Sequence, residues 1–311
     1  MRIAFTHNLQ VSSSEEQAEF DSPATITALR NALTELGHEV HLVEVSELAS
    51  HLVARLESLH PDLVFNTAEG SHGRYREAFF PALFEQLRLP FTGSDAYVCA
   101  LTLDKQAAKL MVATQGVPTP RWVYYDGSTP FAPPDLRFPV IVKPNFEGSS
   151  KGITAESVVD TPAALEELVA RLIDRYATGL LIEEFIDGKD VTVPFLAGAD
   201  TEFDGVLEPA SYGFDASVVG DRKYVIYDYA LKNENPEAVS VQVPADVPDV
   251  TRRRLRVRLA RAIAVSSLKH KQSLIRRTPV SPKPRRRSQR SQASRPSALA
   301  LPVPIRATRQ P

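Results

Sequence analysis

The sequence has little cysteine, no long apolar run and no acidic residue after Asp249. Its one cysteine, Cys99, cannot form an internal disulfide, so a reducing compartment is expected. No stretch approaches the roughly 18 consecutive apolar residues of a membrane span, and the first residues lack the basic and apolar regions of a secretory signal. We therefore expect a cytoplasmic protein that has no membrane anchor.

The absence of acid divides the chain in two. All 38 Asp and Glu lie in residues 1–250, whereas residues 251–311 carry 18 of the 36 Lys and Arg and no acid. This last stretch is rich in Arg, Ser and Pro and has no Gly, Phe, Tyr or Trp, so it has few means of forming a core. We expect residues 251–311 to be a disordered basic tail. Its positive charge is not apparent from the total charge of −2, because the rest of the chain is acidic.

Residues 1–250 alternate short β-branched runs with amphipathic helical patterns, which indicates layered α/β structure. Three strands and two or three crossover helices predict a Rossmann-like α/β domain over residues 1–97. A longer series predicts a second, α+β domain over residues 98–250. The expected strands are 2–6, 38–45, 62–69, 121–125, 138–144, 179–188, 190–198 and 202–212, and the expected helices are 22–37, 75–88, 101–116 and 161–176.

The densest chemical signal is the segment VIVKPNFEGSSKGI, residues 140–153. A strand delivers Lys143 at its end, and residues 147–152, with the sequence EGSSKG, follow four positions later. Small residues let backbone N–H groups approach an anion, and two lysines beside two hydroxyls suit a polyphosphate. A solvated hairpin tip explains this motif about as well when it is taken alone. A Walker A pattern, GxxxxGK[ST], occurs nowhere in residues 1–250.

A second signal is the segment LLIEEFIDGKD, residues 180–190. Here a strand runs into two glutamates and two apolar residues before it reaches Asp190. Such a segment could lie against an adenine ring and hold the ribose hydroxyls with a carboxylate. An acidic strand end is more often simply solvated surface, so this signal is weak by itself.

The ordered combination of three motifs is more specific. Leu103-Asp104-Lys105, then Lys143-Pro144 with the EGSSKG loop, then Ile182-Glu183-Glu184 with Asp190 together resemble the ATP-grasp fold and the D-alanine–D-alanine ligase family. The resemblance runs from about residue 60 to about residue 235. It implies an ATP-grasp fold that follows a Rossmann-like unit, with an incomplete C-terminal sheet. It also implies ATP and Mg²⁺ as cofactors, small amino acids as substrates and a homodimer.

The resemblance also assigns roles to individual residues. Lys105 and Lys143 would bind the α- and β-phosphates of ATP, and Lys232 would reach the γ-phosphate from a mobile loop, although Asn233 stands where the family usually has Tyr. One of Glu15, Glu16 and Glu19 would hold the ammonium group of the first substrate. The flap over the phosphates would be Glu147, Gly148, Ser149, Ser150, Lys151 and Gly152, with Ser149 and Ser150 near the reacting groups. Adenine would contact Glu183, Glu184, Phe185 and Ile186, and the ribose would contact Asp190.

The family's reaction joins two amino acids for peptidoglycan precursors. The carboxylate of the first attacks the γ-phosphate of ATP to give an acyl phosphate, which the amine of the second attacks. The resemblance places the magnesium ligands after the mobile loop, where this chain has its acid-free stretch, so we assign no metal ligand. Two accounts of that stretch remain.

In the first account the reading frame changes near residue 250, and the chain is a truncated, inactive nucleotide-binding homologue. In the second the stretch is a genuine basic arm that binds nucleic acid or an acidic surface, and it starts with a helix at 251–264. Whether the chain is an active enzyme therefore stays open from the sequence.

Overall fold

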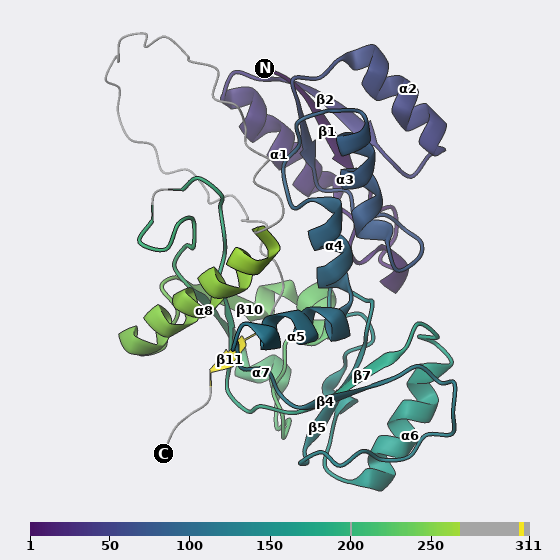
Figure 1. Cartoon of the computed structure of the whole chain (residues 1–311), viewed down its shortest axis with the longest axis vertical. Helices are drawn as coiled ribbons and strands as arrows, with labels where there is room; N and C mark the ends of the chain where they lie inside the picture. Colours follow the sequence, from purple (N-terminus) through teal and green to yellow (C-terminus); the bar gives the residue numbers. More distant parts are fainter. Residues whose placement is uncertain (200, 268–304, 308–311) are drawn as a thin grey trace.

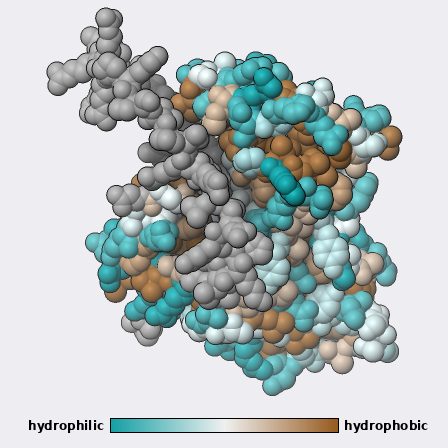
Figure 2. Space-filling model, turned by 45° about the horizontal axis from the view of Figure 1, so that its top comes forward, coloured by the Kyte–Doolittle hydropathy of each residue, from teal (hydrophilic) through white to brown (hydrophobic). Residues whose placement is uncertain are grey.

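The computed structural model of the chain describes residues 1–199, 201–267 and 305–307. These residues form three sheets that follow one another along the chain (Figure 1). Within the same residues no helix is both long and apolar enough to cross a membrane. Figure 2 shows apolar surface in separate patches between hydrophilic areas, as is usual for a folded protein surface.

The N-terminal sheet has the strand order β2-β1-β3 with every pair parallel, as a Rossmann-like unit requires. Apolar side chains of the strands and of α2 and α3 form its core, among them Val43, Leu56 and Phe84. The sequence did not predict α2 as an element of its own. The bounds are β1 Arg2–His7, β2 Glu39–Glu44, β3 Leu63–Asn66, α1 Pro23–Glu35, α2 Ala49–Leu59 and α3 Arg76–Gln86.

The middle sheet has the order β4-β7-β5-β6 and is antiparallel throughout. Helix α6 covers one face, where Leu165 and Leu168 pack against Val140, Val142 and Ile182. Because side chains alternate along a strand, Lys143 and Glu183 lie on the opposite face, which α6 leaves uncovered. The bounds are β4 Trp122–Tyr125, β5 Val140–Pro144, β6 Val158–Val159, β7 Leu180–Glu184 and α6 Pro162–Ile173.

The helix expected at 101–116 is in fact two helices, α4 (Ala96–Leu103) and α5 (Lys105–Thr114). The break falls at Asp104, whose backbone is extended with ψ 95°. Its carboxylate accepts a hydrogen bond from the Ala107 N–H at 3.0 Å, which makes it the N-cap of α5. The new helix start places Lys105 in the first turn of α5.

The third sheet has the order β10-β9-β8-β11 and is also antiparallel. Only the end of the strand expected at 202–212 is extended in this sheet. A π-helical turn, η3 (Ala230–Glu234), lies between β9 and β10. The bounds are β8 Lys189–Thr192, β9 Ala210–Phe214, β10 Val239–Gln242, β11 Ile305–Ala307 and α7 Ala216–Val219, and the short 3-10 turns are η1 Glu15–Gln17, η2 Ala155–Ser157 and η4 Pro236–Ala238.

Helix α8 (Asp249–Ser267) contains the helix considered at 251–264 and corrects the expectation that the whole basic tail is disordered. Leu255 is buried against Val191 of β8 and Ala245, and Arg256 forms an ion pair with Glu208 at 2.9 Å. Acids earlier in the chain thus neutralise part of the charge of α8, so residues 251–267 are ordered as helix. The predicted tail otherwise lies outside the described residues, apart from β11.

Candidate functional site

Lys105 and Lys143 come together because Asn145 links the end of β5 to the start of α5. The Asn145 side chain donates to the Asp104 carboxylate at 2.8 Å and accepts from the Gln106 N–H at 3.0 Å. The Lys105 ammonium group donates to the carbonyl oxygens of Asn145, at 3.3 Å, and Glu147. Burial, with a further contribution from the positive charge of Lys143, lowers the pKa of Lys105 to about 8.

Lys143 forms an ion pair with the buried Glu183 on the neighbouring strand β7. Lys109, one helical turn after Lys105, contacts the other oxygen of the same carboxylate at 2.7 Å. Burial alone would raise the pKa of Glu183, but the two ammonium groups lower it to about 2. Glu183 therefore holds two cations at the sheet face that carries Lys143.

The four residues expected to contact adenine have different surroundings. Glu184 lies on the face opposite Glu183, where it pairs with Arg121 at 3.5 Å and accepts from the Arg137 N–H at 3.0 Å. Phe185 is buried and packs against the Tyr224 ring, with 5.1 Å between ring centroids. Ile186 follows Phe185 in the segment between β7 and β8, and Asp190 is buried on β8, in the third sheet.

The predicted flap is a tight turn in which consecutive residues have left-handed backbones. Ser149 has φ 45°, Ser150 φ 58° and Gly152 φ 71°. The turn is held from one side by η3 and the segment before it. The Ser150 hydroxyl donates to the Tyr227 carbonyl at 2.9 Å, and the Asn233 amide donates to the Ser149 carbonyl at 3.1 Å. Asn233, which departs from the family's pattern, thus contacts the flap directly.

Glu19 holds the flap from the N-terminal side. Its carboxylate accepts from the Gly148 N–H at 2.8 Å and pairs with Lys151 at 2.9 Å and with Arg76 at 3.0 Å. Arg76 also donates to the Phe146 carbonyl at 2.9 Å. The Glu19, Arg76 and Lys151 side chains are all less than 10% exposed, so solvent screens this network little.

Glu15 makes a second contact of the same kind. It accepts from the Gly152 N–H and from the Tyr176 hydroxyl, each at 2.8 Å, and pairs with Arg175. Glu16 is exposed. Of the three glutamates expected as ammonium ligands, two therefore bind the flap in this structure.

Lys232 completes the group of predicted cations. It lies in η3, and its burial lowers its pKa while the nearby charges of Glu19 and Glu69 act in the opposite direction. Within the residues that the structure describes, its ammonium group has no carboxylate within 4.0 Å. It is therefore a cation of the site whose charge is not directly paired there.

Sequence reasoning missed Arg76, Lys109 and two acids of the N-terminal domain, Glu69 and Glu77. Burial, together with the negative charges of Glu77 and Glu19, raises the pKa of Glu69 to about 8. Burial also raises the pKa of Glu77. One signal was present, because Glu69 follows the carboxyl end of a parallel strand, where α/β folds bind ligands.

The family resemblance implies Mg²⁺ as a cofactor but assigns no metal ligand in this chain. Among the described residues no group of three or more His, Cys, Asp or Glu side chains is arranged to hold a metal ion.

An antiparallel sheet that carries two lysines, a small-residue flap and a preceding Rossmann-like unit defines an ATP-grasp protein. Solved structures agree with this fold. The D-alanine–D-alanine ligase of Bacillus anthracis superposes with a TM-score of 0.65 at 20% identity, over 85% of this chain and 78% of that one. The same enzyme complexed with ATP gives a TM-score of 0.64 at 19% identity, over 85% of this chain and 77% of that one.

The sequence comparisons identify the family. Residues 115–270 match the family described as "D-ala D-ala ligase C-terminus", to which the chain belongs. An uncharacterized protein of Sinorhizobium fredii, y4sG, is 37% identical over 55% of this chain and 51% of its own length. The D-alanine–D-alanine ligase of Aquifex aeolicus is 35% identical over 55% of this chain and 56% of its own length. The chain thus spans about half the length of these relatives, and its family match continues to residue 270, beyond residue 235, where we expected the resemblance to end.

Proposed function

We propose that the chain binds ATP and acts as a carboxylate–amine ligase of the D-alanine–D-alanine ligase type. The observation that carries this proposal is the convergence of Lys105 and Lys143 beneath a flap of small residues. These two lysines would hold the phosphates of ATP, which supplies the phosphoryl group that activates the first carboxylate as an acyl phosphate. Lys232 would face the γ-phosphate, because its charge is not paired within the described residues.

The proposed substrates are small amino acids, joined into a dipeptide for cell-wall precursors in the cytoplasm. The positions of Glu15 and Glu19 on the flap favour a positioning role for them over direct binding of the substrate ammonium group. Ser149 and Ser150 would act through the flap backbone, near the reacting groups. Catalysis of phosphoryl transfer depends mainly on such positioning and on charge neutralisation.

A second candidate function is nucleotide binding without turnover. It is favoured by the stretch without Asp or Glu after Asp249, where the family resemblance places the magnesium ligands. An enzyme that cannot hold magnesium between the phosphates would bind a nucleotide and release no ADP.

A coupled ADP-release assay with ATP, D-alanine and magnesium separates the two functions. We expect turnover that is lost in Lys143→Ala and kept in Lys223→Ala, whose lysine is exposed and pairs with Asp160 at 2.8 Å. Nucleotide binding that depends on Lys143 but is never followed by ADP release would support the second function. Binding that is unaffected by Lys143→Ala would contradict both.

A further inference from the structure

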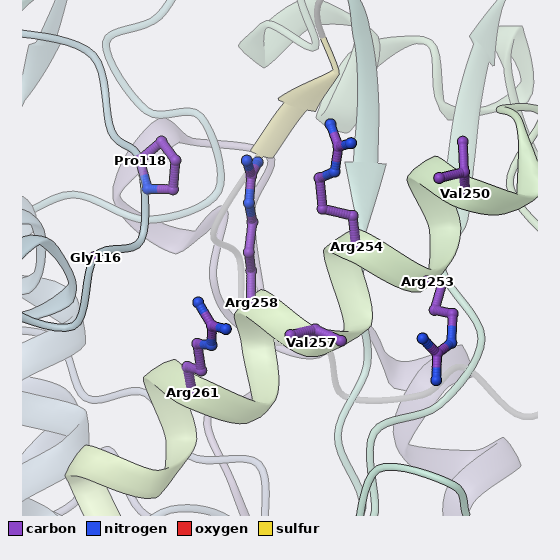
Figure 3. Close-up of a pocket in the computed structure, with 8 residues that line it drawn as sticks. All are labelled: Gly116, Pro118, Val250, Arg253, Arg254, Val257, Arg258 and Arg261. Atoms are coloured by element: carbon purple, nitrogen blue, oxygen red, sulfur yellow. The ribbon is translucent and has the colours of Figure 1, made fainter.

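Three arginines of α8 form a stripe that the fold does not neutralise. Arg254, Arg258 and Arg261 are spaced i, i+4 and i+7, so they lie along one side of the helix. Figure 3 shows all three on the same side of α8, with Arg253 pointing to the other side. Within the part of the chain that the structure describes, none of the three has a carboxylate within 4.0 Å.

The other arginines of α8 differ from this stripe. Arg252 pairs with Asp249, Arg253 with Glu202 at 2.9 Å and Arg256 with Glu208 at 2.9 Å. Acids are therefore placed against the opposite side of the helix only. No residue after Asp249 is acidic, so the rest of the chain beyond α8 cannot supply counter-charges to the stripe either.

The stripe lines a groove of about 420 Å³ between α8 and the segment that follows α5. Besides the three arginines its lining residues are Arg253, which is paired with Glu202, and Val250, Val257, Gly116 and Pro118, and none of them is acidic or aromatic. We call it the arginine groove. Arg258 extends toward Pro118 across it (Figure 3).

We propose that the arginine groove binds a chain of phosphate groups. A guanidinium group binds phosphate with two parallel hydrogen bonds, and it stays charged at every physiological pH. The stripe spans about 10 Å along the helix axis, which is enough for roughly three successive phosphates of a nucleic-acid strand. With no aromatic side chain for base stacking, recognition depends on the backbone charge and not on the base sequence.

This site is separate from the proposed nucleotide site. Lys105 lies at the first turn of α5 and the groove lies beyond its last, so about 15 Å of helix separates them. Binding in the groove consequently does not depend on the proposed ligase activity, and the two are tested by different variants.

The experiment measures binding of a fluorescent single-stranded oligonucleotide of about 15 nucleotides to the full chain at several salt concentrations. For the triple variant Arg254→Gln, Arg258→Gln, Arg261→Gln we expect the affinity to fall roughly 100-fold at 0.1 M salt, and the slope of log K against log salt to become shallower by about 2. The matched control replaces Arg30, Arg88 and Arg171, three exposed arginines outside α8, with Gln, which removes the same charge elsewhere. An equal loss in both variants would mean that net charge alone binds the probe, and the proposal would be overturned.

A second measurement locates the contact and identifies the source of the phosphates. Phenylglyoxal modifies arginine side chains, and mass spectrometry shows which ones have reacted. The oligonucleotide, inorganic polyphosphate or both should block this modification at the three groove arginines. The compound that protects them identifies the source of the bound phosphates. Protection of other arginines only, or equal protection by polyglutamate, would contradict a phosphate-binding groove. Lys143→Ala should leave the protection unchanged.

Discussion

At the scale of single residues, the lowered pKa of Lys105 gives the site a dependence on pH. Burial and the neighbouring Lys143 lower this pKa to about 8, so Lys105 is protonated below that pH and neutral above it. Phosphate binding needs the protonated form. We expect ATP affinity to decrease as the pH rises from 7 to 9. Exposed lysines, with a pKa near 10.4, keep their charge over this range and would not cause such a decrease.

Titration of fluorescent ATP binding against pH checks this prediction, and Lys105→Arg provides the matched control. An arginine stays charged, so the variant should show little change in affinity between pH 7 and 9 whatever its absolute affinity. The same pH dependence in Lys105→Arg would assign the titration to a different group.

The sequence predicted several of the lysines that lie in the candidate site, but not their partners. Lys105, Lys143, Lys151 and Lys232 are recognisable because each lies in a short, ordered motif. Lys151 has one local partner, Glu147 at 2.6 Å, but other counter-charges come from residues far away in the chain, as in the contacts of Lys151 with Glu19 and of Lys143 with Glu183. Such pairs arise from packing of one domain on another, and no local pattern encodes them.

At the scale of elements, the flap depends on the conformation of Gly152. Its φ of 71° is unfavourable for any residue with a side chain, and a Cβ atom there would lie 2.6 Å from the Pro144 ring and 2.8 Å from the Tyr176 ring. We expect Gly152→Ala to destabilise the protein by about 3 kcal/mol and to weaken ATP binding, because the flap must move away from β5.

Gly37→Ala is the control, since Gly37 has φ 84° and open space around its Cα. It should cost only the backbone penalty, about 1 to 2 kcal/mol, and leave ATP binding unchanged. Chemical unfolding and fluorescent ATP titration measure both effects. Equal losses of stability and binding in the two variants would show that the flap has room for a side chain.

The elements themselves were largely predictable, with informative exceptions. The helix patterns of α1 and α6 are clear from their N-caps and their apolar periodicity, and the structure has both. The break at Asp104 was missed because the apolar periodicity continues across it. The break depends on one local contact, in which the Asp104 side chain caps the Ala107 N–H, and the apolar pattern does not show that contact. Helix α8 was placed in the tail because its stabilising acids, Glu202 and Glu208, lie about 50 residues earlier.

At the scale of the whole molecule, two contacts couple the N-terminal domain to the flap of the middle domain. Glu19 accepts from the Gly148 N–H and Glu15 from the Gly152 N–H, so both ends of the flap are held from one N-terminal segment. The buried Glu19 lies between two cations, whereas Glu15 is partly exposed. The two domains should therefore unfold together as long as both contacts exist.

The substitutions Glu19→Gln and Glu15→Gln test this coupling. The first removes one of the two carboxylates that Arg76 and Lys151 share, while Glu147 stays 3.5 Å from Arg76 and 2.6 Å from Lys151, and should cost about 2 kcal/mol of the free energy of unfolding. The second should cost about 1 kcal/mol. The double variant should lose less than the sum, because a flap released at one end has already lost much of the order that the other contact maintains.

Two probes follow the unfolding of separate parts of the molecule in urea. Trp122 is the only tryptophan and lies on β4, so its fluorescence reports the middle sheet, whereas far-UV circular dichroism reports all helices and sheets. In the unsubstituted protein we expect the two transitions to coincide, and in the double variant to separate. Strictly additive losses with coincident transitions would mean that these carboxylates order the flap locally without joining the domains, and the N-terminal unit would then have no part in closing the nucleotide site.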